Sequence, residues 1–139
     1  MAPWQQILDT APHFAAAVRR HFDARTHKTI ATLRVDGSPR ISGIEASFAN
    51  GDLSFGSMSN ARKAYDLRRD QRFALHSGSM DPPDWEGDAK ISGRAQEVEP
   101  NRFRADIEEA VVVRLNEARD GLVIELWRPG RELKRIERT

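Results

Sequence analysis

The stretch KTIATLRVDGSPRISGIEASFANGDLSFGS, residues 28–57, decides the fold. Its first part, Lys28 to Val35, is rich in β-branched residues and is followed by the strong turn signal DGSP. The next run, Arg40 to Ala49, places alternate residues on two faces. Asn50-Gly51 then supplies the signal for a type I′ hairpin turn before Asp52 to Ser57. The pattern predicts three antiparallel strands that follow one another as a meander.

A helix is expected on the amino-terminal side of this meander. Apolar residues recur at three- and four-residue spacing from Trp4 to Phe22, which is typical of a helix with one buried face. Pro12 interrupts the pattern, and Thr10 is a residue type that caps a helix with proline in its first turn. We therefore expect a short turn, a break, and a longer helix that ends near Asp23.

A short second helix, ARKAYDLRRD, is expected at residues 61–70. Ser59 or Asn60 is the expected cap, because both side chains accept hydrogen bonds from the first amides of a helix. Ala64 and Leu67 fall on the face that points inward.

Further strands follow this second helix. Residues 103–115 have both a helical and an alternating pattern, but three consecutive valines lose side-chain freedom in a helix, which favours a strand. Gly93 is a candidate bulge or bend. About eight short strands with frequent turn signals indicate a mostly β barrel or sandwich. The later strands are predicted at residues 71–76, 88–99, 103–115, 122–127 and near 132–136, with a turn-rich loop at 77–87.

The composition excludes several classes of protein. The 139 residues suit a single domain, 1–139, and contain 22 Lys and Arg against 21 Asp and Glu, a balance that disfavours nucleic-acid binding. The absence of cysteine excludes disulfides, thiolate metal sites and a cysteine nucleophile. No apolar run approaches the roughly 20 residues of a membrane-spanning helix, and no secretion signal is visible at the start. A cytoplasmic protein without a membrane partner is the expectation.

One segment, FGSMSNARKAYDLRR at residues 55–69, has the residue types of an anion site. A strand ends at Gly56-Ser57, a hydroxyl-rich loop follows, and Arg62 and Lys63 lie in the first turn of a helix. Exposed amides, the helix dipole and two cations favour a terminal phosphate there. The alternative is a solvated helix start with incidental charges. The four histidines lack the spacing of metal ligands, so no metal site is predicted.

Three motifs carry a more specific resemblance: PRISGIE at 39–45, FGSMSNARKAYDL at 55–67, and LWRPGR at 126–131. Their order resembles the pyridoxamine 5′-phosphate oxidase-like split-barrel family over about residues 10–138, and more closely its small actinobacterial branch of flavin- and deazaflavin-dependent reductases. The resemblance implies a six- to eight-stranded split β-barrel with an N-terminal helix and a short helix between strands 3 and 4. It also implies a homodimer that holds each flavin in a groove between its subunits.

The resemblance also implies which residues bind the cofactor. The strand with the basic side chain would follow the ring and ribityl chain, Arg62 and Lys63 would grip the phosphate, and Trp127 of the other subunit would close the ring pocket. Ala61 stands where the oxidase pattern has a serine, so Ser57 or Ser59 would replace that donor. The implied cofactor-binding set is Arg40, Ile41, Ser42, Gly43, Phe55, Gly56, Ser57, Ser59, Arg62, Lys63 and Trp127.

The function implied is an oxidoreductase that uses FMN or coenzyme F-420 and transfers hydride to or from a small organic substrate. Vitamin B6 oxidation is not expected, because Arg131-Glu132-Leu133-Lys134 replaces the Arg-Leu-His-Asp substrate motif. No side chain stands out as a catalytic acid or base. F-420 carries a polyglutamate tail that Arg68, Arg69 and Arg72 would meet. The alternative is a non-catalytic flavin or haem carrier or sensor, with His76 or a histidine of the first helix as the haem ligand.

Overall fold

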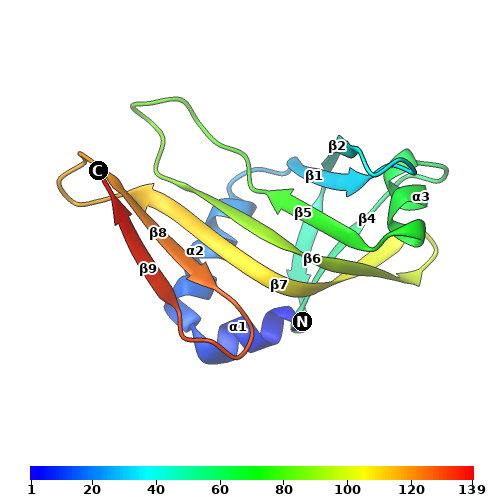
Figure 1. Ribbon diagram of the computed structural model, residues 1–139, viewed down its shortest axis with the longest axis horizontal. Helices are drawn as coiled ribbons and strands as arrows, with labels where there is room; N and C mark the ends of the chain where they lie inside the picture. Colours follow the sequence, from blue (N-terminus) through cyan, green and yellow to red (C-terminus); the bar gives the residue numbers. More distant parts are fainter.

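The computed structural model describes all 139 residues and contains three helices (Figure 1). The first two, α1 (Trp4–Thr10) and α2 (Pro12–Asp23), are separated at Ala11, whose ψ of 67° is not helical. The predicted break and longer helix are confirmed, whereas the segment expected as a short turn is a seven-residue helix. The third helix, α3 (Arg62–Arg69), lies between the fourth and fifth strands. None of the three has the length and apolar character that crossing a membrane requires.

The remaining elements are strands, so the chain is mostly β as predicted. The Arg40–Ala49 run is divided at Glu45 into two strands, which brings the total to nine. The last strand begins two residues later than expected and continues to Arg138. The strands are β1 (Lys28–Leu33), β2 (Pro39–Ile44), β3 (Ala46–Ala49), β4 (Asp52–Gly56), β5 (Arg72–His76), β6 (Asp88–Glu99), β7 (Arg102–Leu115), β8 (Leu122–Trp127) and β9 (Lys134–Arg138).

The bend at Glu45 lets one sheet curl into a split barrel. The hydrogen-bonded order is β2-β1-β5-β6-β7-β4-β3, with β8 and β9 added beyond β7. The two ends of this path, β2 and β3, are consecutive in the chain, and they pair with β1 and β4 respectively. Asn50 and Gly51 have φ values of 54° and 80°, the two positive angles that a type I′ turn requires between β3 and β4.

The two longest strands, β6 and β7, pair with each other in the middle of the sheet (Figure 1). The strand prediction for 103–115 is confirmed, and the run of valines pairs with β6 and β8. The register shifts between Ser92 and Gly93, which confirms the predicted bulge. A Cβ at Gly93 would collide with the carbonyl oxygen of Asp106, so the bulge needs glycine.

Helices α1 and α2 pack over the barrel and complete its core. The Trp4 and Phe48 rings lie 4.6 Å apart, and Trp127 donates a hydrogen bond from Nε1 to Thr10 Oγ1 at 3.1 Å. Thr10 does not cap α2. Its hydroxyl donates to the Gln6 carbonyl, and the N-cap of α2 is Ala11, so the expected cap is wrong.

Helix α3 also begins without the cap that we expected. Its N-cap is Ala61, which has no side-chain acceptor. Asn60 has φ 66° and accepts a hydrogen bond from the Tyr65 hydroxyl instead. Ala64 and Leu67 are buried as predicted. The first amides of α3 are therefore left without a side-chain partner, which bears on the site below.

An ion pair joins α3 to the turn between β6 and β7. Arg68 donates to both carboxylate oxygens of Glu97 (3.0 and 2.7 Å), and Glu97 also accepts from the Asn101 amide. These hydrogen bonds lower the pKa of Glu97 from 4.5 to about 2. Because the folded pKa is the lower one, the stabilisation is complete above about pH 4.5 and is lost as the pH falls toward 2.

Replacing Glu97 with glutamine is therefore expected to flatten the loss of stability between about pH 4.5 and 2. Urea unfolding midpoints, measured across this interval for the wild type and for Glu97→Gln, test the prediction. Glu99→Gln is the matched control, because Glu99 is exposed and forms no ion pair. A loss of stability between pH 4.5 and 2 that is as steep in Glu97→Gln as in Glu99→Gln would contradict the prediction.

Candidate functional site

A pocket of about 390 Å³ lies where β2, β4 and α3 meet. Lys63, on the first turn of α3, donates from Nζ to the Gly43 carbonyl at 2.8 Å and so spans the pocket. The Ser57 hydroxyl is buried here and has no hydrogen-bond partner. Buried polar atoms are nearly always paired, so this hydroxyl has hydrogen-bonding capacity for a water or a ligand atom. The lining residues are His27, Gly43, Ile44, Glu45, Gly56, Ser57, Met58 and Lys63.

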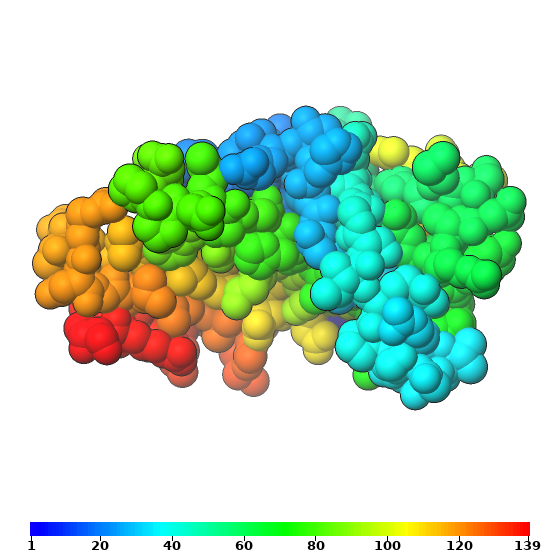
Figure 2. All heavy atoms as spheres, turned by 90° about the horizontal axis from the view of Figure 1, so that it is seen from above, coloured from blue at the N-terminus to red at the C-terminus, as the bar shows by residue number.

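Four of the predicted cofactor residues, Gly43, Gly56, Ser57 and Lys63, thus come together in one pocket. They derive from three separate segments, which the curl of the sheet and α3 bring together. In Figure 2 the β1–β2 hairpin, coloured blue to cyan, lies beside α3, coloured green. The pocket has the donors of a phosphate site: an ammonium group, a free hydroxyl and the uncapped start of a helix.

The other predicted residues near α3 lie outside this pocket. Arg62 and Ser59 are exposed, and Arg62 forms no ion pair. Ser42 is half-buried on β2, and its neighbour Ile41 is 74% exposed on the outer face of the sheet.

Two predicted residues face the core of their own chain. The Phe55 ring is 1% exposed and packs on Phe73 and Phe103, with ring centroids 5.4 and 6.2 Å away. Trp127 is 2% exposed and bonded to Thr10. The Trp127 ring is therefore packed within its own chain, and its implied role at the ring pocket of the other subunit stays a prediction.

Arg40 binds a buried carboxylate in this structure, and its role in cofactor binding stays a prediction. Its Nε lies 2.7 Å from Asp66 Oδ2, which also accepts the Thr32 hydroxyl at 2.8 Å. Arg69 donates to Asp66 Oδ1 at 3.3 Å. Burial favours the protonated form of Asp66, but these hydrogen bonds outweigh it and hold the pKa of Asp66 below 3.8. The network fixes α3, and Lys63 with it, against β1 and β2.

The arginines expected to meet a polyglutamate tail already have acidic partners. Arg68 pairs with Glu97, Arg69 with Asp66, and Arg72 with Asp70 at 2.7 Å. Hydrogen bonds from Arg72 lower the pKa of Asp70 to about 2. Each of these arginines therefore already has an acidic partner within the chain.

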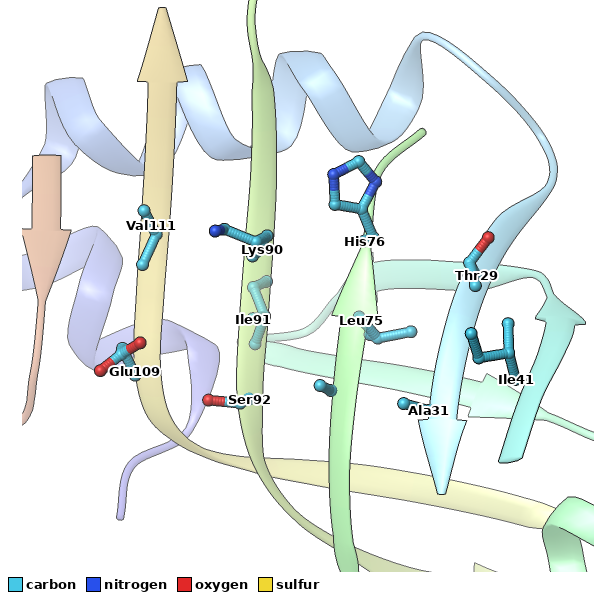
Figure 3. Close-up of a pocket in the computed structure, with 11 residues that line it drawn as sticks. Thr29, Ala31, Ile41, Leu75, His76, Lys90, Ile91, Ser92, Glu109 and Val111 are labelled. Carbon is cyan, nitrogen blue, oxygen red and sulfur yellow. The ribbon is translucent and has the colours of Figure 1, made fainter. Parts of the chain in front are cut away.

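A second depression, of about 360 Å³, crosses the outer face of the sheet, and we call it the trough (Figure 3). Cross-strand pairing places Ile41, Ala31, Ala74, Ser92 and Glu109 in one row from β2 to β7. The adjacent row contains Gly43, Thr29, His76, Lys90 and Val111. Gly43 also lines the Lys63 pocket, so the row that contains His76 and Lys90 ends beside that pocket.

His76, at one end of the trough, has a defined hydrogen-bond arrangement. Its Nδ1 accepts the Gly78 amide at 3.0 Å, and its Nε2 lies 3.7 Å from Asp88 Oδ1. Because Nδ1 is an acceptor, the proton of the neutral ring is on Nε2. That nitrogen has no free lone pair for iron, which disfavours His76 as a haem ligand.

Comparison with solved structures identifies the fold. PhzG from Burkholderia lata 383, in complex with tetrahydrophenazine-1-carboxylic acid, superposes with a TM-score of 0.66 at 14% identity over 99% of this chain and 93% of its own. A pyridoxamine 5′-phosphate oxidase-related, FMN-binding protein from Nostoc punctiforme PCC 73102 gives 0.65 at 12% identity over 100% and 98%. A haem-binding protein from Mycobacterium smegmatis gives 0.57 at 16% identity over 87% and 57%.

No family model and no curated protein matches the sequence. The structural likenesses establish that the chain has the pyridoxamine 5′-phosphate oxidase-like split-barrel fold, as the motifs indicated. The closer likeness to the actinobacterial branch stays a prediction.

Proposed function

We propose that this chain binds FMN with the phosphate in the Lys63 pocket. The observation that carries the proposal is the buried, unpartnered hydroxyl of Ser57 in the pocket that Lys63 also lines. A phosphate oxygen there would accept from both groups and from the uncapped start of α3. Gly56 and Gly43 leave room for the backbone to approach the ligand closely.

Two observations support FMN over F-420 as the cofactor. Arg68, Arg69 and Arg72 are paired within the chain and leave a polyglutamate tail without free cations at this end of α3. One protein of this fold is described as FMN-binding. F-420 remains the alternative against which FMN is tested.

The activity we propose is that of an oxidoreductase acting on a small organic substrate. Bound FMN supplies the hydride-transfer chemistry, and the protein supplies binding, orientation and exclusion of water. The outer face of β2, from Ile41 to Gly43, would support the flavin ring next to the phosphate pocket. No side chain is assigned as an acid or base.

A second copy of the chain is the partner that suits the outer face. Partly exposed apolar residues form cross-strand pairs on β7, β8 and β9, including Val113 with Ile124 and Ile124 with Ile136. This apolar strip adjoins the trough at Val111, which pairs with Leu126. A homodimer packed on the strip would cover it and provide the second wall of the trough.

Single-turnover reduction separates an enzyme from a cofactor carrier. The FMN-loaded protein is reduced without oxygen and mixed with a panel of organic acceptors, and flavin absorbance is followed. Reoxidation that is faster than for free reduced FMN is the expected result. Equal rates for bound and free FMN with every acceptor would favour a carrier. Because His76 is unsuited to iron, His76→Ala is expected to give the same absorption spectrum with added haemin as the wild type.

A further inference from the structure

The trough contains one ionisable side chain without a partner. Glu109 accepts two hydrogen bonds from Arg128, at 2.7 and 3.0 Å, and the His76 Nε2 faces Asp88. Lys90, the cross-strand partner of His76, forms neither an ion pair nor a hydrogen bond. Figure 3 shows His76 and Lys90 toward one end of the trough, and Ser92 and Glu109 toward the other. The free positive charge of the trough is therefore at the Lys90 end.

The floor of the trough is made of small side chains. Ala31, Ala74 and Ser92 are consecutive across β1, β5 and β6, and Ile41 stands beside them on β2. A row of small residues on a sheet between larger neighbours leaves a shallow, apolar slot. The volume, about 360 Å³, is within the range of small-molecule sites. A flat apolar body fits this floor better than a branched or globular one.

The Lys90 end is distinct from the phosphate pocket. Gly43, which lines that pocket, is in the same cross-strand row as Lys90 but three strands away. With strands spaced about 4.8 Å apart, the two positions are separated by about 14 Å. An anion at Lys90 would therefore be separate from one in the Lys63 pocket.

We propose that the trough binds a flat, conjugated organic acid, with its carboxylate at Lys90 and its ring system on Ala31 and Ala74. This inference rests on the proposed oxidoreductase function and names the substrate class of that site. Discrimination comes from the charge, because a neutral molecule of the same shape leaves the Lys90 ammonium group unpaired.

Two probes of equal shape, 2-naphthoate and 2-naphthamide, test the inference by calorimetric titration of the whole protein with and without FMN. The wild type is expected to bind the acid at least about tenfold more tightly than the amide. Lys90→Met should remove this preference by weakening the acid alone. Ala74→Leu, on the exposed face of β5, should weaken both probes by filling the floor.

Lys63→Met is the matched control, since it should leave naphthoate binding intact while it weakens FMN. Equal wild-type affinity for acid and amide, or an unchanged acid preference in Lys90→Met, would overturn the inference. Failure of both probes to bind would also overturn it. Naphthoate binding that depends on Lys90 in a protein that does not bind FMN would refute the proposed function but leave the acid site standing.

Discussion

Replacing Asp66 with alanine is expected to lower the free energy of unfolding by about 3 kcal/mol, because it removes the buried centre of a charged network. Asp66 is 3% exposed and accepts from Arg40, Thr32 and Arg69. Alanine would leave the buried Thr32 hydroxyl unpaired and Arg40 without its carboxylate. Few other single changes outside the hydrophobic core should cost as much.

Urea unfolding measures this loss of free energy, provided that the dependence of the unfolding free energy on urea concentration is the same in the variant and the wild type. Asp70→Ala is the control, because Asp70 also pairs with an arginine but at the surface, where ion pairs contribute little. A loss in Asp66→Ala no larger than that in Asp70→Ala would show that the network is not a structural anchor. Since the network holds α3 in place, Asp66→Ala should also weaken FMN binding.

Lys63→Met is expected to raise the dissociation constant for FMN by about 10- to 100-fold. A charge-assisted hydrogen bond to phosphate contributes about 1.5–3 kcal/mol, and methionine keeps the length of the side chain without its charge. The Lys63 ammonium group already spans the pocket through its bond to Gly43, so it needs little reordering to meet a phosphate. Flavin fluorescence quenching gives both constants.

Arg62→Met supplies the comparison for Lys63. Both cations lie on the first turn of α3, but Arg62 is exposed and only Lys63 lines the pocket. The effect of Arg62→Met should therefore be the smaller one. Equal effects, or no effect of Lys63→Met, would place the phosphate elsewhere.

Local signals predicted most of the fold. The turn at Asn50 and Gly51 depends on the conformations that those two residues tolerate, and the strand character of residues 111–113 depends on β-branching. Both are properties of neighbouring residues, so they can be recognised from the sequence. The division at Glu45 was missed because alternation continues across it, and only the pairing of β2 with β1 and of β3 with β4 separates the two strands.

In the candidate site, the contacts that could not be predicted are those that depend on distant residues. Arg40 is held by Asp66, 26 positions away, and the Trp127 indole is held by Thr10, 117 positions away. Nothing near Arg40 or Trp127 in the sequence indicates these partners. The sequence did not indicate Lys90 for the same reason. Its proposed role as the carboxylate-binding group depends on which neighbours across the sheet are already paired.

Titration of the purified protein with FMN and with F-420 in parallel tests the central claim most directly. The account predicts saturable binding of one FMN per chain, tighter than that of F-420, with the Ser57→Ala variant weakened. Absence of FMN binding, or FMN affinity unchanged by both Ser57→Ala and Lys63→Met, would contradict it.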